Sequence, residues 1–435
     1  MVTATRPKAS AASRAEVPGQ RGAGPAGAVP RPRTHQGAGR FGPLRVQQLV
    51  LVEVAAALLL VAWATRPLLL LPAAVPAAVL VLLALVRRRH RPVPEWLVTV
   101  VEARARKRRG ARPLPALTDP AFAPAAECDP TLRTLSHTGG TGRPVGMVGD
   151  GTFLTAVLQV EALDVPLRPL RTANPLPLDV LYDGLEVDGI RLESVQVVQH
   201  TQPAPAPHMP QQAVAVRSYA PLQAQSGAPA VRLTWVAVKL NPELCPEAVA
   251  ARGGGLGGAQ RSLVRAAHQL ASRLTGAGFR VTVLTEPEVV AAVATSSCAN
   301  PRATEQTVRT GAAPRRTAES ARAWRCDDRW HTTYWIGRWP RLGTAAGGAP
   351  APNLVALLTS LPTLATTFSL TARRGLGDVP ELTGHVRITG RSDSELVAAR
   401  RQLERTAQGV KVELVRLDRE QVPGLLATLP LGGAR

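Results

Sequence analysis

Residues 231–285 read VRLTWVAVKLNPELCPEAVAARGGGLGGAQRSLVRAAHQLASRLTGAGFRVTVLT. The stretch begins and ends with runs rich in β-branched residues (231–240 and 279–285), which favour strands. Between them, residues 262–274 have the apolar spacing of a helix. This order predicts a β-α-β passage whose two strands neighbour one another in a buried sheet.

Strands and helices alternate on both sides of this passage. Before it, residues 143–161 predict a hairpin that turns at Asp150-Gly151, because Asp-Gly supplies the positive φ that such turns need. The remaining predicted elements are a helix at 178–187 ending near Gly189, a strand at 191–201, a proline-rich loop at 202–212, a helix at 289–295, a strand at 331–340, a helix at 353–361, strands at 366–374 and 384–389, a helix at 392–408 and a strand at 410–417. The predicted fold class is a mixed α/β body over residues 136–435.

The segment 296–322 interrupts this alternation. It is polar, basic and unpatterned, so we expect a mobile loop or linker there. Two lobes divided near 296–325 and one continuous sheet both remain open.

Two long apolar stretches precede the body, at 46–65 and 68–86. Each has about the ~20 residues that a bilayer core requires, and only Arg66 and Pro67 separate them. The short linker predicts a two-helix transmembrane hairpin whose outer ends lie on one side. Because basic clusters flank those ends, the positive-inside rule places the N-terminus and the body in the cytoplasm of a multi-pass plasma-membrane protein.

The formal net charge of +21 is concentrated around this hairpin. Residues 1–45 predict a disordered basic tail, and residues 87–135 a basic juxtamembrane region containing an amphipathic helix at 96–110. Attraction to anionic lipid accounts for these charges. Nucleic-acid binding through the tail is a further hypothesis, although the sequence predicts no specific nucleic-acid partner.

The glycines at 252–261 raise the question of a nucleotide site. Gly253, Gly255 and Gly258 have the G-x-G-x-x-G spacing with which dinucleotide-binding folds hold a pyrophosphate, and Glu286 lies near the position of the ribose-binding acid. Such folds place the glycines directly after the strand. Here residues 241–251 intervene and predict a helical turn of their own.

A P-loop is excluded on different grounds. It needs a lysine after the last glycine, whereas Ala259 and Gln260 follow Gly258. We therefore favour a connection in which small residues let the chain pass close to a neighbour. The sequence predicts no catalytic residue, no cofactor and no metal.

The other chemically versatile residues support this prediction. The histidines show no pair at metal-ligand spacing, and surface or core positions are expected for His137, His200, His208, His268, His331 and His385. The four cysteines are isolated and are expected to be reduced thiols of a cytosolic domain; the alternative is a disulfide between Cys298 and Cys326.

A group of tryptophans and acids lies near residue 330. Core anchoring, a partner contact and base stacking all remain open for Trp324, Trp330, Trp335 and Trp339. The pair Asp327-Asp328 stands beside Arg325 and Arg329, which favours an ion-paired patch over an acid/base pair.

The order of five segments carries a family resemblance: VGMVGDGTFLTAVLQVE (145–161), PLDVLYDGLEVDGIRLESVQVVQHT (177–201), TWVAVKLNPELCPEAVAARGGGLGGAQR (234–261), HTTYWIGRWP (331–340) and LDREQVPGLLATLPLGG (417–433). After two N-terminal spans, these segments closely resemble the EccE component of type VII secretion systems. The resemblance covers about 46–433. The Ala-, Arg- and Pro-rich composition agrees with a GC-rich actinobacterial genome.

The resemblance implies a non-enzymatic part of an inner-membrane secretion machine. In that family EccE assembles with EccB, EccC and EccD, the FtsK-like ATPase EccC supplies the energy, and WXG100-type proteins are exported. It implies no catalytic residue. The alternative function is a membrane-anchored, nucleotide-dependent transferase that uses the glycine loop at 252–261.

Overall fold

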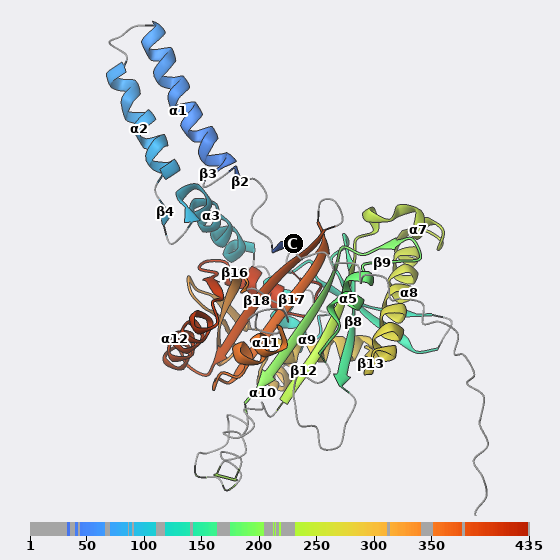
Figure 1. The fold of residues 1–435 in the computed structure, drawn as a ribbon. Coiled ribbons are helices and arrows are strands. Elements are labelled where there is room, and N and C mark those ends of the chain that lie inside the picture. Colours follow the sequence, from blue (N-terminus) through green and yellow to red (C-terminus); the bar gives the residue numbers. More distant parts are fainter. Residues whose placement is uncertain are drawn as a thin grey trace, which may run out of the picture. The chain divides into compact units, whose positions relative to one another are not determined.

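The computed structural model describes residues 33–34, 40–41, 44–65, 70–85, 87–88, 91–109, 118–139, 142–162, 175–203, 212, 214, 217–218, 231–310, 314–340, 351–375 and 379–433. All of them belong to one unit, Pro32–Arg435 (Figure 1). Most of the predicted basic tail, the linker at 66–67 and most of the proline-rich segment 202–212 lie outside the described residues.

A 13-stranded sheet forms the body, which confirms the predicted mixed α/β class. Its main path runs in the order β14 (Thr317–Glu319), β15 (Trp324–Cys326), β16 (Arg329–Arg338), β18 (Pro380–Gly390), β17 (Ala365–Arg374), β11 (Ser194–Gln202), β12 (Val231–Leu240), β8 (Leu154–Ala162), β7 (Pro144–Gly149) and β6 (Arg133–Thr138). Off this path, β13 (Phe279–Val283) pairs with β8, β19 (Glu413–Arg416) with β16, and β1 (Arg33–Thr34) with β18. The pairings are antiparallel except that of β1 with β18.

Residues 231–285 fold into β12, the 3-10 helix η2 (Pro242–Leu244), α7 (Pro246–Ala250), α8 (Gly255–Gly276) and β13. Both strands pair with β8 and share its residues Leu158 and Gln159, so they lie on opposite edges of β8. The β-α-β passage is therefore present, but the prediction that its strands are direct neighbours is wrong. The earlier strand β8 lies between them.

The sheet contains one arrangement of elements twice. In the first half, β8 pairs with the preceding strand β7, with β12, and with β13 after α8. In the second half, β16 pairs in the same way with β15, with β18, and with β19, which follows α12 (Asp393–Gly409). The halves join where β11 pairs with β17, from Val195↔Ala372 to Thr201↔Thr366. Strands from both sides of the segment 296–325 thus belong to one sheet.

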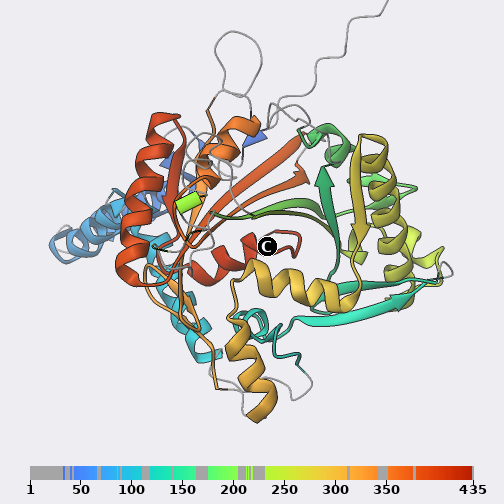
Figure 2. The ribbon, with the colours of Figure 1, turned by 90° about the horizontal axis from the view of Figure 1, so that it is seen from below.

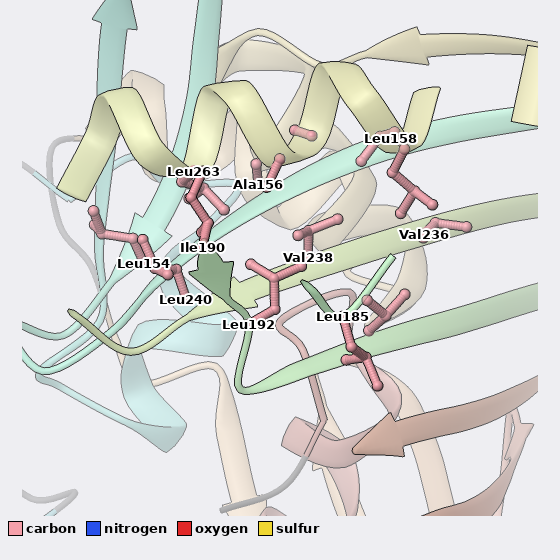
Figure 3. Packing of buried hydrophobic residues seen from close by; sticks show 14 of the residues in the cluster. Leu154, Ala156, Leu158, Leu185, Ile190, Leu192, Val236, Val238, Leu240 and Leu263 are labelled. Carbon is pink, nitrogen blue, oxygen red and sulfur yellow. The ribbon is translucent and has the colours of Figure 1, made fainter. Parts of the chain in front are cut away.

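One face of the sheet is apolar. α8 covers the first half of this face and buries Leu263, Leu270 and Leu274, whose spacing of seven and four residues is that of one face of an amphipathic helix. Figure 3 shows Leu158 and Val238 of the sheet lying under α8. α11 (Ala351–Thr359) and α12 cover the second half of the same face. Each fully buried Leu or Val side chain stabilises the fold by roughly 1.5–3 kcal/mol.

The opposite face carries α9 (Glu286–Ser296), α13 (Gln421–Thr428) and α4 (Ala123–Cys128), as Figure 2 shows for the two longer helices. Here the alternate residues of the central strands are largely polar, although they are fully buried. They include Thr155, Ser194, Gln196, His200, Lys239, Thr367, Ser369 and Arg387. Because buried polar groups need partners, the segments that cover this face must supply hydrogen bonds as well as apolar contact.

Local predictions near turns have mixed outcomes. The hairpin at Asp150-Gly151 is confirmed: Gly151 has φ 96° and Asp150 Oδ1 accepts from the Thr152 amide at 2.9 Å. The helix predicted at 178–187 ends early, as α5 (Leu178–Asp183). A second Asp-Gly turn, Asp188-Gly189, with φ 52° and 74°, instead joins β9 (Glu186–Val187) to β10 (Ile190–Arg191).

The prediction of a mobile loop or linker at 296–322 is wrong in part. This segment contains α10 (Pro301–Thr310) and the edge strand β14. Pro301 is the first residue of α10, and the Asn300 side chain accepts from the Arg302 amide at 3.0 Å. An asparagine followed by a proline at the first helical position is a common helix start. The polar, basic composition of the segment gave no indication of this helix.

The N-terminal helices are α1 (Val46–Thr65) and α2 (Leu70–Leu85), which pack against each other. Among the residues 52–65 and 71–81, whose burial the structure describes, the buried ones are Ala55, Ala62, Ala73 and Ala77, whereas the exposed ones include Val54, Leu60, Val61, Trp63, Leu71 and Val75. Within the described part of the chain, no helix meets the length and apolarity that crossing a membrane requires. The membrane anchorage of the hairpin stays a prediction.

The helix predicted at 96–110 is confirmed as α3 (Val93–Arg109). Two short hairpins, β2 (Arg40–Phe41) with β3 (Leu44–Arg45) and β4 (Arg87–Arg88) with β5 (Arg91–Pro92), precede α1 and α3 respectively. α3 contacts the body through Arg106, whose guanidinium lies 3.5 Å from a Glu319 carboxylate oxygen and donates to the Arg419 carbonyl at 2.5 Å.

Candidate functional site

The glycine loop lies between α7 and α8, not between a strand and a helix. η2 and α7 fill residues 242–250, which confirms the predicted helical turn between the strand and the glycines. Gly253, Gly254 and Gly255 have φ of 92°, 66° and 55°, and α8 begins at Gly255. Glycine is needed here because left-handed backbone is costly for other residues.

Gly258 explains why a small residue follows in the helix. A Cβ at this position would lie 2.5 Å from the Val249 carbonyl oxygen. The Gly258 carbonyl also accepts a hydrogen bond of 2.9 Å from the buried Ser262 hydroxyl. The glycine therefore permits close contact between α7 and α8, as expected for a packing role.

The two arginines that frame the signature close the loop on itself. Arg261 Nε donates to the Arg252 carbonyl at 2.7 Å, and Arg252 Nη1 donates to the Ala248 carbonyl at 2.9 Å. A Cβ on Gly253 would lie 2.5 Å from Arg261 Nη2, so the guanidinium occupies the space beside the glycines. Sequence reasoning missed this role, although an arginine at each end of RGGGLGGAQR was its visible signal.

Glu286 does not stand free at a strand end. It is the first residue of α9, which begins with a capping box between Thr285 and Glu288. Its backbone packs on Gly146 of β7, where a Cβ would lie 2.4 Å from the Glu286 nitrogen. These contacts give Glu286 a structural position.

The histidines fall into two groups. His200, His331 and His385 are buried on three different strands of the polar face. Burial lowers the pKa of His200 to about 3 and that of His385 to about 4, and it lowers the pKa of His331 well below the ordinary value. All three are therefore neutral at pH 7. His137 lies in β6 and His268 in α8, and His208 is outside the described residues.

Metal and disulfide chemistry find no support in the residues that the structure describes. No group of three or more His, Cys, Asp or Glu side chains there is arranged to hold a metal ion. Cys128, Cys245, Cys298 and Cys326 are free thiols, so the alternative of a Cys298–Cys326 disulfide is wrong. Burial raises the pKa of Cys298 and of Cys326, which keeps both thiols protonated.

The tryptophans and acids near residue 330 have structural partners. Trp324 is 1% exposed and its ring centroid lies 4.8 Å from that of His331, which supports core anchoring. Arg325 lies 5.9 Å over the Trp330 ring. Asp328 pairs with Arg329 at 3.3 Å, as expected.

The partner of Asp327 differs from the prediction. Asp327 pairs at 2.7 Å with Arg316, and not with Arg325 or Arg329. Burial raises the pKa of Asp327, but hydrogen bonds from Arg316 and the Asn300 amide outweigh it and hold that pKa below the usual range. The ion-paired interpretation of the patch is confirmed.

The C-terminal TLPLGG segment lies in a slot on the polar face of the sheet. Gln196 donates to the Ala427 carbonyl at 2.9 Å and accepts from the Gly432 amide at 2.8 Å, while Ser194 donates to the Gly432 carbonyl at 2.6 Å. Thr155 donates to the Leu431 carbonyl at 3.1 Å.

The slot accepts only glycine at its end. Gly432 and Gly433 have φ of 88° and 87°. A Cβ on Gly432 would lie 2.5 Å from the Lys239 Cβ, and one on Gly433 would lie 2.4 Å from the Thr371 hydroxyl. Sequence reasoning used TLPLGG only as a signature and did not predict these partners.

Comparison with known families identifies the central part of the chain. Residues 228–336 match the family described as "Putative type VII ESX secretion system translocon, EccE". The match runs from β12 through the glycine loop and α8 into β16. No curated protein matches the sequence. The match confirms the resemblance to EccE over the residues that it covers.

Proposed function

From the EccE domain at residues 228–336, we propose that this protein is a non-enzymatic membrane subunit of the type VII secretion complex. It supports assembly of the complex with EccB, EccC and EccD and the export of WXG100-type proteins driven by the EccC ATPase. The observation that carries this proposal is that the residues of the family signatures contact other parts of the same chain, and that Arg261 fills the space beside the glycines where a ligand would lie. Gly258, Arg261 and Gly432 all serve contacts within the chain.

In this proposal the hairpin of α1 and α2 anchors the chain in the plasma membrane, with the N-terminus and the α/β body of residues 136–435 in the cytoplasm. Alanines on the inside with large apolar side chains on the outside are the distribution favoured for helices that contact each other within lipid. The basic clusters at the outer ends of the hairpin support the orientation.

α3 and the basic tail contact anionic lipid in this arrangement. Val98 and Val101 are exposed on α3, as are the basic side chains of Arg104, Lys107 and Arg108. A helix that exposes both apolar and basic side chains suits the interface of an anionic membrane. Arg106 on α3 instead holds the helix to the body through Glu319.

The competing function is the nucleotide-dependent transferase. Arg261 occupies the space beside the glycines, and no lysine follows Gly258, so the loop has little to offer a phosphate. Thermal unfolding of the full chain in detergent, measured with ATP, UTP and nucleotide sugars, should show no stabilisation. Nucleotide-dependent stabilisation that disappears in Gly255→Val would instead support the transferase.

Co-purification tests the proposal directly. The tagged full chain, solubilised in mild detergent from cells that express the whole system, should retain EccB, EccC and EccD. A deletion of the hairpin, residues 46–86, should lose them while the body stays folded. Recovery of the full chain alone, at wild-type expression of the other components, would contradict the proposal.

A further inference from the structure

Two long cationic side chains are buried on the polar face of the sheet, one in each half. Lys239 lies in β12 and is 2% exposed, and Arg387 lies in β18 and is fully buried. β12 and β18 have equivalent places in the two halves. Each cation lies beneath the segment at the end of a covering helix: Gly432 follows α13 and packs on Lys239, and Ser296 ends α9 and contacts Arg387. The two environments can therefore be compared within one molecule.

Lys239 has a counter-charge. Its ammonium lies 2.8 Å from a carboxylate oxygen of Glu193, which also lies 3.7 Å from Arg373. The ammonium also sits 4.4 Å over the Phe153 ring. Burial lowers the pKa of Lys239, and the bond to Glu193 opposes that effect. The cost of burying this charge is offset by an ion pair.

Among the residues that the structure describes, Arg387 contacts no such carboxylate. Its Nη2 donates to the Ser296 carbonyl and lies 3.2 Å from the Thr367 hydroxyl and 3.5 Å from the Ser296 hydroxyl. Nε and Nη1 are buried without a hydrogen-bond partner in the described part of the chain. A guanidinium carries five donor hydrogens in a fixed plane, so most of its donors remain unused.

The charge on Arg387 persists at neutral pH. Burial lowers its pKa to about 10, which still leaves the group protonated. The carbonyl of Ser296 at the C-terminus of α9 offers about half of a negative charge. The nearby Cys298 thiol, whose pKa is raised by burial, stays neutral. A buried charge of this kind normally requires full compensation, because desolvation costs several kcal/mol.

Neutral polar side chains surround Arg387. His331 is neutral, its Nδ1 lies 3.0 Å from the Thr389 hydroxyl, and its Nε2 is buried without a partner in the described residues. His331 and Thr389 are paired residues of β16 and β18, two positions along the same face from Arg387. The Thr389 hydroxyl is engaged by His331, and the Thr367 hydroxyl lies 2.9 Å from His200 Nδ1. The unpaired Nε and Nη1 donors of a cation with no carboxylate among its described contacts are the chemistry of an anion site. His331 Nε2 adds a donor in the tautomer in which Nδ1 accepts from Thr389.

We propose that the core binds a small monovalent anion of the size of chloride at the unpaired Nε and Nη1 of Arg387 in β18. The anion supplies the counter-charge for Arg387, as the Glu193 carboxylate does for Lys239. Because Arg387 belongs to the second half and Ser296 to the first, the site contributes to the contact between them. This inference does not depend on the proposed role in secretion.

The stability of the full chain in detergent tests the proposal at constant ionic strength, with gluconate replacing chloride. The melting temperature should rise by about 2–4 °C for each tenfold increase of chloride above its dissociation constant. Arg387→Met should abolish this dependence, because the cation that needs the anion is gone. Lys239→Met is the matched control and should retain it. Equal chloride dependence in wild type and Arg387→Met, or none in wild type, overturns the proposal.

A second measurement covers the case in which Arg387→Met does not fold. Crystals of the wild-type full chain grown in bromide should show an anomalous peak within hydrogen-bonding distance of the Arg387 guanidinium. Density there without anomalous signal, at bromide concentrations that label other sites, identifies water and overturns the proposal.

Discussion

At the scale of single residues, the glycine signature acts through steric fit. A Cβ at position 258 would lie 2.5 Å from the Val249 carbonyl, which is backbone and cannot rotate away. Gly258→Ala should therefore lower the free energy of unfolding by about 1–3 kcal/mol, as overpacking does. Urea denaturation followed by circular dichroism measures the change.

Gly276→Ala in the same helix is the control for Gly258→Ala. Its Cβ would meet no atom within 4 Å, so the variant should be as stable as the wild type or slightly more stable. A Gly258→Ala variant with wild-type stability would contradict the packing role and reopen the question of a ligand at the loop.

The buried histidines give the body a defined pH dependence. Burial, and then the Arg387 charge, lower the pKa of His200 to about 3; burial lowers that of His385 to about 4. Below the ordinary pKa of 6.5, the unfolded chain binds protons that the folded chain cannot. Stability should thus be lost as the pH falls from 6.5 towards 4, by up to about 1.4 kcal/mol per pH unit for each histidine.

Melting temperatures from pH 7.5 to 4 measure this loss. His200→Gln, which cannot take up the proton, should flatten the profile, whereas His268→Gln, at an exposed position of α8, should leave the slope unchanged. The same slope in all three proteins would show that His200 does not set the acid limit.

At the scale of elements, Gln196 joins the central strand β11 to the C-terminal segment. Its amide contacts Ser369, Ala427 and Gly432. Gln196→Ala leaves the Gly432 amide and the Ala427 carbonyl without this partner, and we expect a loss of about 2–4 kcal/mol. Hydrogen exchange should accelerate selectively at residues 427–433.

Gln199→Ala is the matched control, because Gln199 lies in the same strand on the other face and is only partly buried. It should change stability by less than about 0.5 kcal/mol, as surface substitutions do. If Gln196→Ala leaves exchange at residues 427–433 unchanged, the segment is held by other contacts.

The same elements show what sequence patterns can and cannot predict. The apolar spacing of 262–274 correctly predicts α8, because a helix needs only its own period and a core-facing stripe. The slot for TLPLGG was not predicted, since Thr155, Ser194 and Gln196 lie more than 230 residues away in sequence. Apolar and polar residues alternate in the same way whether the polar face of a strand is buried or exposed. The sequence around Arg387 therefore does not show that this residue is buried.

At the scale of the whole molecule, the order of strands was beyond sequence reasoning. β8 lies between β12 and β13, in an arrangement that recurs around β16 in the second half, and pairing between distant strands leaves no mark in a local pattern. The two halves are joined by seven consecutive residue pairs between β11 and β17, from residue 195 to residue 201 of β11. We expect this uninterrupted strand pairing to couple the halves. Whether the halves behave as two lobes or as one body depends on how strongly this junction couples them.

Calorimetry tests the coupling. Since β11 and β17 are both central strands with buried side chains, the body should unfold in one transition, with calorimetric and van't Hoff enthalpies in agreement. Val198→Pro, which removes a backbone donor from β11 in the middle of the stretch that pairs with β17, should destabilise both halves together. Two separate transitions in the wild type would show that the halves are independent lobes.

The central claim is that the protein works through its neighbours in a type VII secretion complex. Crosslinking and mass spectrometry of the intact complex in native membranes test it most directly. We predict crosslinks from the body to cytoplasmic regions of EccB, EccC or EccD, and crosslinks from α3 on the same side of the membrane. A body that crosslinks to none of them, while they crosslink to one another, would contradict the account.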